Sequence, residues 1–177
     1  IAVATGRAAE MGLLFRKGTA LEALARADTV VLDKTGTLTR GKPTLVRVLP
    51  FGLSQEEALR LAAALERGSE HPLAKAVLEA AESLPQAQAE EVRALPGEGV
   101  EGRVEGRRLH LGGPALMERL GVPLPEEAKA LPEEGYTPLY LVEGTRLLAA
   151  FAVFDPPRPE AQEAVAALKA LGLKLVL

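Results

Sequence analysis

The feature that most constrains the fold is an apolar run, Thr29-Val30-Val31-Leu32, that leads directly into Asp33 and a series of turn-forming residues. A short apolar run bounded by turn residues is typical of a buried strand in a parallel sheet. The residues that follow such strands lie at the carboxyl edge of an α/β sheet, where ligands usually bind. The sequence therefore predicts an α/β unit that presents the carboxylate of Asp33 at this edge.

Composition limits the classes of protein that the chain can belong to. Its 177 residues, of which 47% are hydrophobic and 25% charged, suffice for one ordinary domain or two small ones. The net charge of −3 and the lack of basic clusters interleaved with aromatic residues argue against nucleic acid as a partner. The absence of cysteine excludes disulfides and thiolate metal sites. The longest apolar runs, such as residues 149–154, are far shorter than the ~20 residues that a membrane helix needs.

Apolar residues at helical spacing predict several helices after residue 50. Ser54-Gln55-Glu56-Glu57 is a capping box, and apolar residues follow it at intervals of three and four. A second helix is expected to begin at His71-Pro72, because proline is favoured at the first helical position. Shorter helical stretches are expected at residues 116–120 and 126–134.

In the middle of the chain the apolar period falls to two, which predicts strands at 100–104, 107–111, 139–142 and 147–154. Beyond residue 155 the pattern returns to a helix and a strand. This order predicts an α/β fold in which a parallel sheet is interrupted by an α+β domain with an antiparallel sheet. The expected boundaries assign residues 1–44 and 154–177 to the interrupted domain and residues 45–153 to the inserted one.

The heptapeptide that begins at Asp33 resembles the phosphorylation signature of the P-type ATPases, which lie in the haloacid dehalogenase superfamily. The resemblance implies a catalytic site of Asp33, Lys34 and Thr35, in which Asp33 attacks the γ-phosphate of ATP and becomes an aspartyl phosphate. It also implies that Asp33 and Thr35 hold Mg²⁺. Phosphatases of the superfamily carry a second aspartate where this chain has Thr35, and threonine cannot act as that acid.

Two motifs in the expected inserted domain are similar to those of the heavy-metal pumps. Ser69-Glu70-His71-Pro72-Leu73 looks like the signature whose histidine contacts adenine, with an upstream glutamate, here Glu66, in the same pocket. Gly97 and Gly99 resemble a glycine pair that lets the nucleotide approach the backbone, which glycine suits because it has no Cβ. The implied ligands are ATP and Mg²⁺, with Glu66, His71, Gly97 and Gly99 around the nucleotide.

Together the motifs imply a partial haloacid-dehalogenase-like phosphorylation domain interrupted by a nucleotide-binding domain. The chain would be the cytoplasmic part of a membrane-bound pump that exports Cu⁺, with both ends cut from a longer polypeptide. Its partners would be the transmembrane and actuator domains of that polypeptide, and the transported ion would bind elsewhere. By itself the chain would bind ATP but turn over poorly. Three alternatives remain open: a zinc or cadmium P-type ATPase, a soluble phosphatase of the superfamily, and a non-catalytic nucleotide-sensing module.

The remaining patterns predict little chemistry. Gly97-x-Gly99-x-x-Gly102 fits a dinucleotide fingerprint, but a strand and not a helix is expected after it. His110 alternates with leucines on a strand, so its side chain is expected on the opposite, solvated face without a function. Asp155 and Arg158 flank a proline-rich junction and are expected to form a hinge between the domains.

Overall fold

The computed structural model describes all of residues 1–177, which fold as two compact units. The split unit consists of Ile1–Leu38 and Arg158–Leu177, and the continuous unit consists of Thr39–Pro157. The continuous unit extends beyond residues 45–153 on both sides because its flanking residues pair with each other, Thr39 bridging to Pro157. No helix in the structure has the length and hydropathy of a membrane span.

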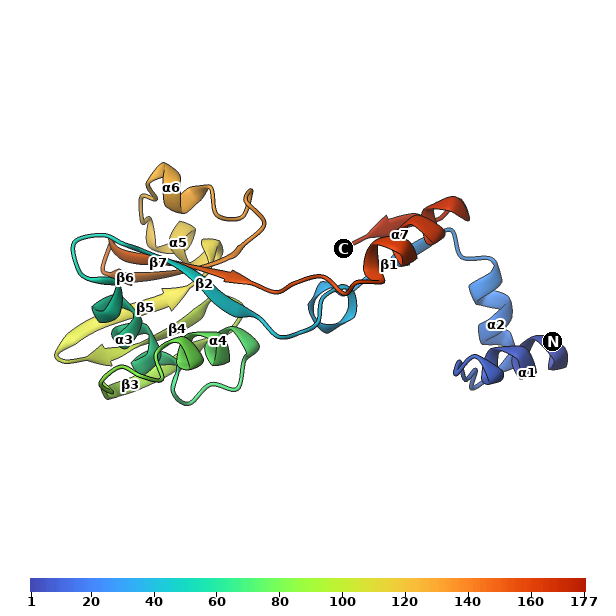
Figure 1. The fold of residues 1–177 in the computed structure, drawn as a ribbon, viewed down its shortest axis with the longest axis horizontal. Helices are drawn as coiled ribbons and strands as arrows, with labels where there is room; N and C mark the ends of the chain where they lie inside the picture. Colours follow the sequence, from blue (N-terminus) through green and yellow to red (C-terminus); the bar gives the residue numbers. More distant parts are fainter. The chain divides into compact units, whose positions relative to one another are not determined.

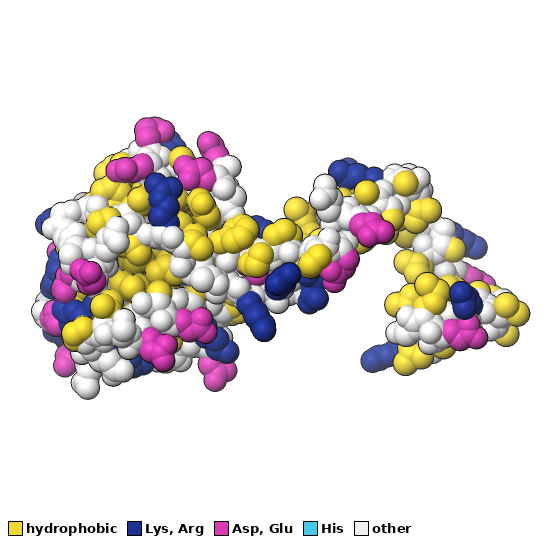
Figure 2. Space-filling model, viewed as in Figure 1, with side chains coloured by type: hydrophobic (Ala, Val, Ile, Leu, Met, Phe, Trp, Pro, Cys, Tyr) yellow, Lys and Arg dark blue, Asp and Glu magenta, His cyan; other side chains and the backbone are white.

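The split unit contains a two-stranded parallel sheet, formed by β1 (Thr29–Val31) and β8 (Lys174–Val176). The predicted parallel pairing is therefore confirmed, but the expected burial of this strand is wrong: Val31 is 74% exposed, because no helix of this unit buries residues against the sheet. A tight turn, η1 (Lys34–Leu38), follows Asp33. The helices are α1 (Ala2–Glu10), α2 (Gly18–Ala25) and α7 (Ala161–Ala170), and none of them contains a buried residue. Figure 2 accordingly shows hydrophobic side chains, in yellow, on the surface of this unit.

The continuous unit is built on a six-stranded antiparallel sheet with the order β2-β7-β6-β5-β4-β3 (Figure 1). The predicted antiparallel α+β architecture is confirmed. The strands are β2 (Thr44–Pro50), β3 (Ala89–Leu95), β4 (Gly99–Val104), β5 (Arg107–Gly112), β6 (Thr137–Glu143) and β7 (Arg146–Phe154).

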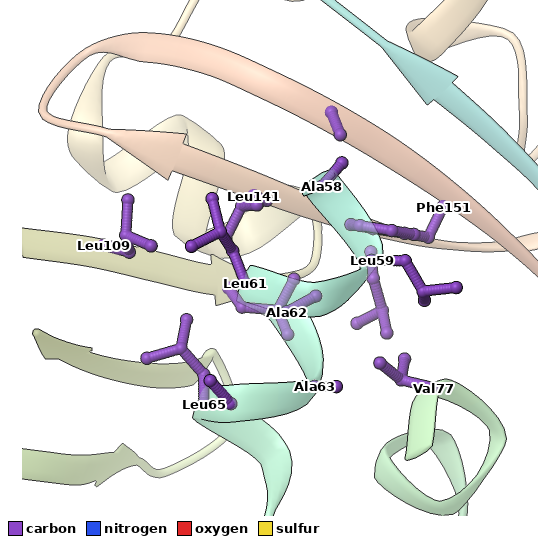
Figure 3. Packing of buried hydrophobic residues seen from close by; sticks show 14 of the residues in the cluster. Ala58, Leu59, Leu61, Ala62, Ala63, Leu65, Val77, Leu109, Leu141 and Phe151 are labelled. Atoms are coloured by element: carbon purple, nitrogen blue, oxygen red, sulfur yellow. The ribbon is translucent and has the colours of Figure 1, made fainter. Parts of the chain in front are cut away.

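Helices cover both faces of this sheet (Figure 1). One core contains residues of α3 (Gln55–Glu66) and α4 (Pro72–Ala80), and the other contains residues of α5 (Pro114–Leu120) and α6 (Glu126–Lys129). Alternate residues of β6 join opposite cores: Leu141 lies in the first and Tyr140 in the second. Figure 3 shows how α3 side chains such as Leu61 pack with Phe151 and Leu141 of the sheet in the first core. Cover on both faces explains why β7 is apolar at nearly every position.

Three expectations about secondary structure require correction. Strands β2 and β3 lie outside the four strands that the apolar period predicts. Strand β3 could not be predicted from an apolar period, because it lies at the edge of the sheet and most of its side chains are exposed. The helix expected at 126–134 ends at Lys129, because Pro132 lacks the N–H that would continue the helical hydrogen bonds.

The segments by which the chain enters and leaves the continuous unit lie side by side, as the insertion hypothesis requires. Thr44 pairs with Phe154 at the end of the β2–β7 ladder. The carboxylate of Asp155 accepts hydrogen bonds from the hydroxyl of Thr39 and, at 3.2 Å, from the N–H of Lys42. Within the split unit, the guanidinium of Arg158 donates to the carbonyl of Gly36 at 3.1 Å. Asp155 thus holds the entering and leaving segments together.

Candidate functional site

The continuous unit contains a cavity of about 670 Å³ that brings together all four residues predicted to surround a nucleotide. Glu66 and His71 contribute from the end of α3 and the start of α4. Gly97 and Gly99 contribute from the turn between β3 and β4. Such a volume is typical of small-molecule sites. Residues of β3, the end of β5, the start of α5 and the start of β6 also line the cavity, and the lining includes no lysine or arginine.

Glu66 is the last residue of α3, and only 9% of its surface is exposed. Its carboxyl group lines the cavity and has no hydrogen-bond donor from the protein within reach. Burial raises the pKa of Glu66 to about 7, because desolvation disfavours the charged form. At neutral pH the cavity therefore contains a carboxyl group that is protonated in a large fraction of molecules and that can both donate and accept a hydrogen bond.

His71 caps α4 and lines the cavity at the same time. Its Nδ1 accepts the N–H of Leu73 at 3.2 Å, and its own backbone N–H donates to the hydroxyl of Ser69 at 3.2 Å. Because Nδ1 is an acceptor, the proton of the neutral imidazole lies on Nε2. The cap thus fixes the ring and leaves an N–H donor for a ligand.

Glycine is required at Gly97 and at Gly99 for different structural reasons. Gly99 has φ +150°, and a Cβ there would lie 2.1 Å from the carbonyl oxygen of Leu111, so the pairing of β4 with β5 requires glycine. Gly97 has φ +75°, and a Cβ there would meet nothing within 4 Å. The backbone at Gly97 is therefore open to an approaching ligand, whereas Gly99 is needed by the sheet itself. Strand β4 begins at Gly99, which confirms that the dinucleotide fingerprint lacks its helix.

The sequence analysis missed Gly112, which also lines the cavity. Gly112 pairs directly with Gly99, and a Cβ on it would lie 2.1 Å from the carbonyl oxygen of Glu98 and 2.7 Å from Leu116. The available signal was the sequence Gly112-Gly113-Pro114, which marks a strand end followed by a proline-started helix. The two facing glycines bring the β3–β4 turn close to the start of α5.

Asp33, Lys34 and Thr35 lie in the split unit, directly after β1. All three are exposed, and Gly36, at φ +78°, lets the chain turn sharply behind them. Asp33 and Thr35 supply oxygen donors, the type that Mg²⁺ prefers. The chain contains no cluster of three or more His, Cys, Asp or Glu side chains that could hold a metal ion. These residues therefore fit a Mg²⁺ site that phosphate oxygens, water or other ligands complete, and they do not fit a closed protein site.

The expectation that His110 lies on a solvated face is wrong. Its side chain is only 16% exposed, and Nε2 lies 2.9 Å from a carboxylate oxygen of Glu101. Glu101 is directly opposite on β4, and Arg93 from the next strand pairs with the same carboxylate. Cross-strand neighbours thus cover the ring, which periodicity within a single strand does not reveal.

Comparison with known proteins connects this geometry to a family. Residues 27–177 match the model of the haloacid dehalogenase-like hydrolases. The chain is 43% identical over 183 residues to copper-transporting ATPase 1 of Rhizobium meliloti (strain 1021), in an alignment that covers 100% of this chain and 22% of the relative. The chain thus spans about a fifth of the length of that relative.

Solved structures show the same likeness. A zinc-transporting PIB-type ATPase in the E2.Pi state is 38% identical, with a TM-score of 0.59, over 97% of this chain and 29% of that chain. The N-domain of a copper-transporting P-type ATPase is 26% identical, with a TM-score of 0.55, over 64% of this chain and 99% of that domain. Since the family model matches the chain from before Asp33 through the entire continuous unit, this chain belongs to the haloacid dehalogenase-like hydrolases.

Proposed function

We propose that this chain is the ATP-binding and phosphoryl-accepting cytoplasmic region of a heavy-metal-exporting P-type ATPase, with Cu⁺ as the transported ion. The observation that carries the proposal is the cavity, which gathers Glu66, His71, Gly97 and Gly99 from three separate segments of the chain. A relative that is 43% identical is named as a copper-transporting ATPase, which supports the choice of ion.

In this proposal the cavity binds the adenosine part of ATP. Its lining is largely apolar, as a base requires, and the Nε2–H of His71 and the carboxyl of Glu66 are its convergent polar groups. The lining contains two acidic side chains, Glu66 and Glu98, and no lysine or arginine, so it offers nothing to neutralise a triphosphate. The phosphates therefore extend out of the cavity.

Asp33 is the proposed phosphoryl acceptor. One oxygen of its carboxylate forms a bond to the γ-phosphorus, the bond from that phosphorus to the β–γ bridging oxygen breaks, and ADP leaves. Mg²⁺, when held by Asp33 and Thr35, would supply charge neutralisation for the transferring phosphoryl group. Because Thr35 cannot donate a proton to a leaving group or activate water as an aspartate does, the aspartyl phosphate persists.

The two units take separate roles in this proposal. The continuous unit, residues 39–157, forms the nucleotide-binding domain, and the split unit, residues 1–38 with 158–177, forms part of the phosphorylation domain. Since Asp33 and the cavity belong to different units, the γ-phosphate of ATP held by one unit must reach a carboxylate of the other. The transmembrane and actuator domains of the parent protein would supply the metal path and the group that promotes dephosphorylation, with this region on the cytoplasmic face of the membrane.

A second candidate for the transported ion is Zn²⁺, because a zinc-transporting PIB-type ATPase is 38% identical to this chain. Metal-stimulated ATP hydrolysis by the parent protein separates the two candidates: stimulation by Cu⁺ alone supports the proposal, and stimulation by Zn²⁺ alone contradicts it. Turnover of p-nitrophenyl phosphate by this chain would instead favour a soluble phosphatase.

Nucleotide binding is tested by titrating the chain with ATP while its backbone amide resonances are recorded. Shifts are expected at the four cavity residues, and His71→Ala is expected to weaken binding roughly tenfold through loss of a buried hydrogen bond. His110→Ala is the matched control, because His110 does not line the cavity. Shifts that cluster elsewhere, or equal affinities of the two variants, would show that the site is misplaced.

Phosphoryl transfer is tested in the parent protein with ATP labelled on the γ-phosphate. We expect a labelled protein that hydroxylamine cleaves, since an acyl phosphate reacts with it and a phosphoserine does not. Asp33→Asn should abolish the label, and Asp28→Asn, directly before β1, should retain it. Label that resists hydroxylamine or survives in Asp33→Asn contradicts the assignment.

A further inference from the structure

We propose that Glu66 selects the base by binding adenine through its protonated carboxyl group, so that nucleotide binding in this cavity takes up a proton. The inference rests on the proposed nucleotide site and adds to it the protonation state of a lining residue and a dependence of binding on pH. It starts from one geometric fact: a carboxyl group that is about nine-tenths buried lines the cavity without any partner from the protein.

The surroundings of Glu66 exclude the usual ways in which a buried carboxylate is stabilised. No lysine or arginine lines the cavity. Arg119 pairs with Glu98, the other acidic residue of the lining, at a nitrogen–oxygen distance of 2.7 Å. Arg67, the residue after Glu66, donates to the carbonyl of Ala87 at 2.9 Å. A buried carboxyl group without a cation or a donor retains its proton more strongly, and burial accordingly raises the pKa of Glu66 to about 7.

A protonated carboxyl group matches one base and an ionised one matches another. The protonated group has one donor and one acceptor, whereas the carboxylate has acceptors only. Adenine presents a ring-nitrogen acceptor beside its amino donor, so it pairs with the protonated form. The pairing edge of guanine presents two adjacent N–H donors, which suit the carboxylate. The proton on Glu66 therefore favours adenine over guanine.

Other titratable groups around the cavity are few, which keeps the expected pH dependence simple. His71 faces it from α4 and Glu98 faces it from the turn between β3 and β4. Glu98 is already paired with Arg119, and the lining segments of β4, β5 and β6 contribute no titratable side chain. Only His71 needs to be separated from Glu66 by experiment.

The experiment is calorimetric titration of the whole chain with adenosine, which carries no phosphate that titrates in this range. Repeating it in two buffers of different ionisation enthalpy gives the number of protons taken up. At about pH 8 we expect uptake of close to one proton, and at about pH 6 uptake near a tenth of one, since most Glu66 is already protonated there. The affinity should fall roughly tenfold from pH 6 to pH 8, and the preference for adenosine over guanosine should fall with it.

Glu66→Gln is the decisive variant, because glutamine has a donor and an acceptor at every pH. It should bind adenosine at both pH values without proton uptake. His71→Gln, whatever its effect on affinity, should retain the uptake. Absence of uptake in the unmodified chain, or its persistence in Glu66→Gln, would overturn the inference while leaving the nucleotide site intact. Failure of the unmodified chain to bind either adenosine or ATP would instead overturn the proposed function.

Discussion

The split unit and the continuous unit contain similar elements, but they differ in how much of their surface these elements bury. In the continuous unit both faces of a six-stranded sheet are covered, and residues such as Leu61 and Phe151 are fully buried. In the split unit two three-residue strands pair, and Val31 and Leu171 remain 74% and 76% exposed. Burial of apolar surface is the main stabilising term, so the stability of this chain lies in the continuous unit.

The comparison teaches that correct secondary structure is not sufficient for a stable unit. The split unit contains three helices, yet none of them buries an apolar side chain against another element. The residues proposed for nucleotide binding and for phosphoryl transfer are also divided between the two units. The cavity lies in the well-packed unit, and the proposed acceptor Asp33 lies in the exposed one.

The largest expected effect comes from separating the two units. Residues 39–157 expressed alone should unfold cooperatively, with a denaturation midpoint close to that of the whole chain, because both cores lie within them. A chain that joins residues 1–38 to 158–177 should show no cooperative transition. The measurement is urea denaturation followed by circular dichroism. A gradual, non-cooperative loss of signal from residues 39–157 would mean that the comparison is drawn wrongly.

Truncating one large side chain in each unit tests the same difference within the whole chain. Phe151→Ala removes a fully buried ring from the first core and should lower the free energy of unfolding by about 3–5 kcal/mol. Leu171→Ala removes a side chain that is mostly exposed and should change it by less than about 0.5 kcal/mol. Similar losses for the two variants, measured by urea denaturation, would contradict the assignment of stability to the continuous unit.

Two neighbouring glycines, Gly112 and Gly113, allow a packed position and an open position to be compared at the edge of the cavity. Gly112→Ala forces a Cβ against the carbonyl of Glu98 and should cost about 2–4 kcal/mol of unfolding free energy. Gly113→Ala places a Cβ in open space and should cost about 1 kcal/mol or less, the effect of a poorer helix cap. If both variants melt at the same temperature, the close approach of β5 to the β3–β4 turn is not rigid.

A further effect on stability comes from Glu66, because burial disfavours the charged form of its carboxyl group. Its pKa is about 7 in the folded state and about 4.5 in the unfolded chain, so the folded state binds more protons between these values. This residue therefore makes stability fall as pH rises from about 4.5 to 7, by up to about 3 kcal/mol, and has no further effect above that.

Urea denaturation at several pH values in this range, with Glu66→Gln as the control, isolates this term, because glutamine does not titrate. The difference in unfolding free energy between the two proteins should shift steadily in favour of Glu66→Gln as pH rises. A difference that is constant with pH would show that the carboxyl group gains solvent or a partner in solution.

Much of this protein could be predicted from short-range patterns. Ser54 caps α3 as predicted, its hydroxyl accepting the N–H of Glu57, although the carboxylate of Glu57 binds Arg60 and does not complete the box; α4 begins at Pro72 as predicted. Hairpins and apolar runs predicted four of the six strands of the larger sheet. The motifs also named Glu66 and His71, which line one cavity. Each of these signals depends on residues that are close together in the chain, where spacing and propensity act directly.

Tertiary structure decided what depends on residues far apart in the sequence. Edge strand β3 forms because β4 offers its backbone, and His110 is covered by the cross-strand Glu101, neither of which a local period can show. The raised pKa of Glu66 depends on its burial by other segments of the chain. The close approach of Gly112 to Gly99 depends on the pairing of β5 with β4. The sequence alone thus pointed to the residues that we propose carry the chemistry. Only the packed structure decided how deeply each is buried and what it meets there, because desolvation and steric contact are properties of the assembled core.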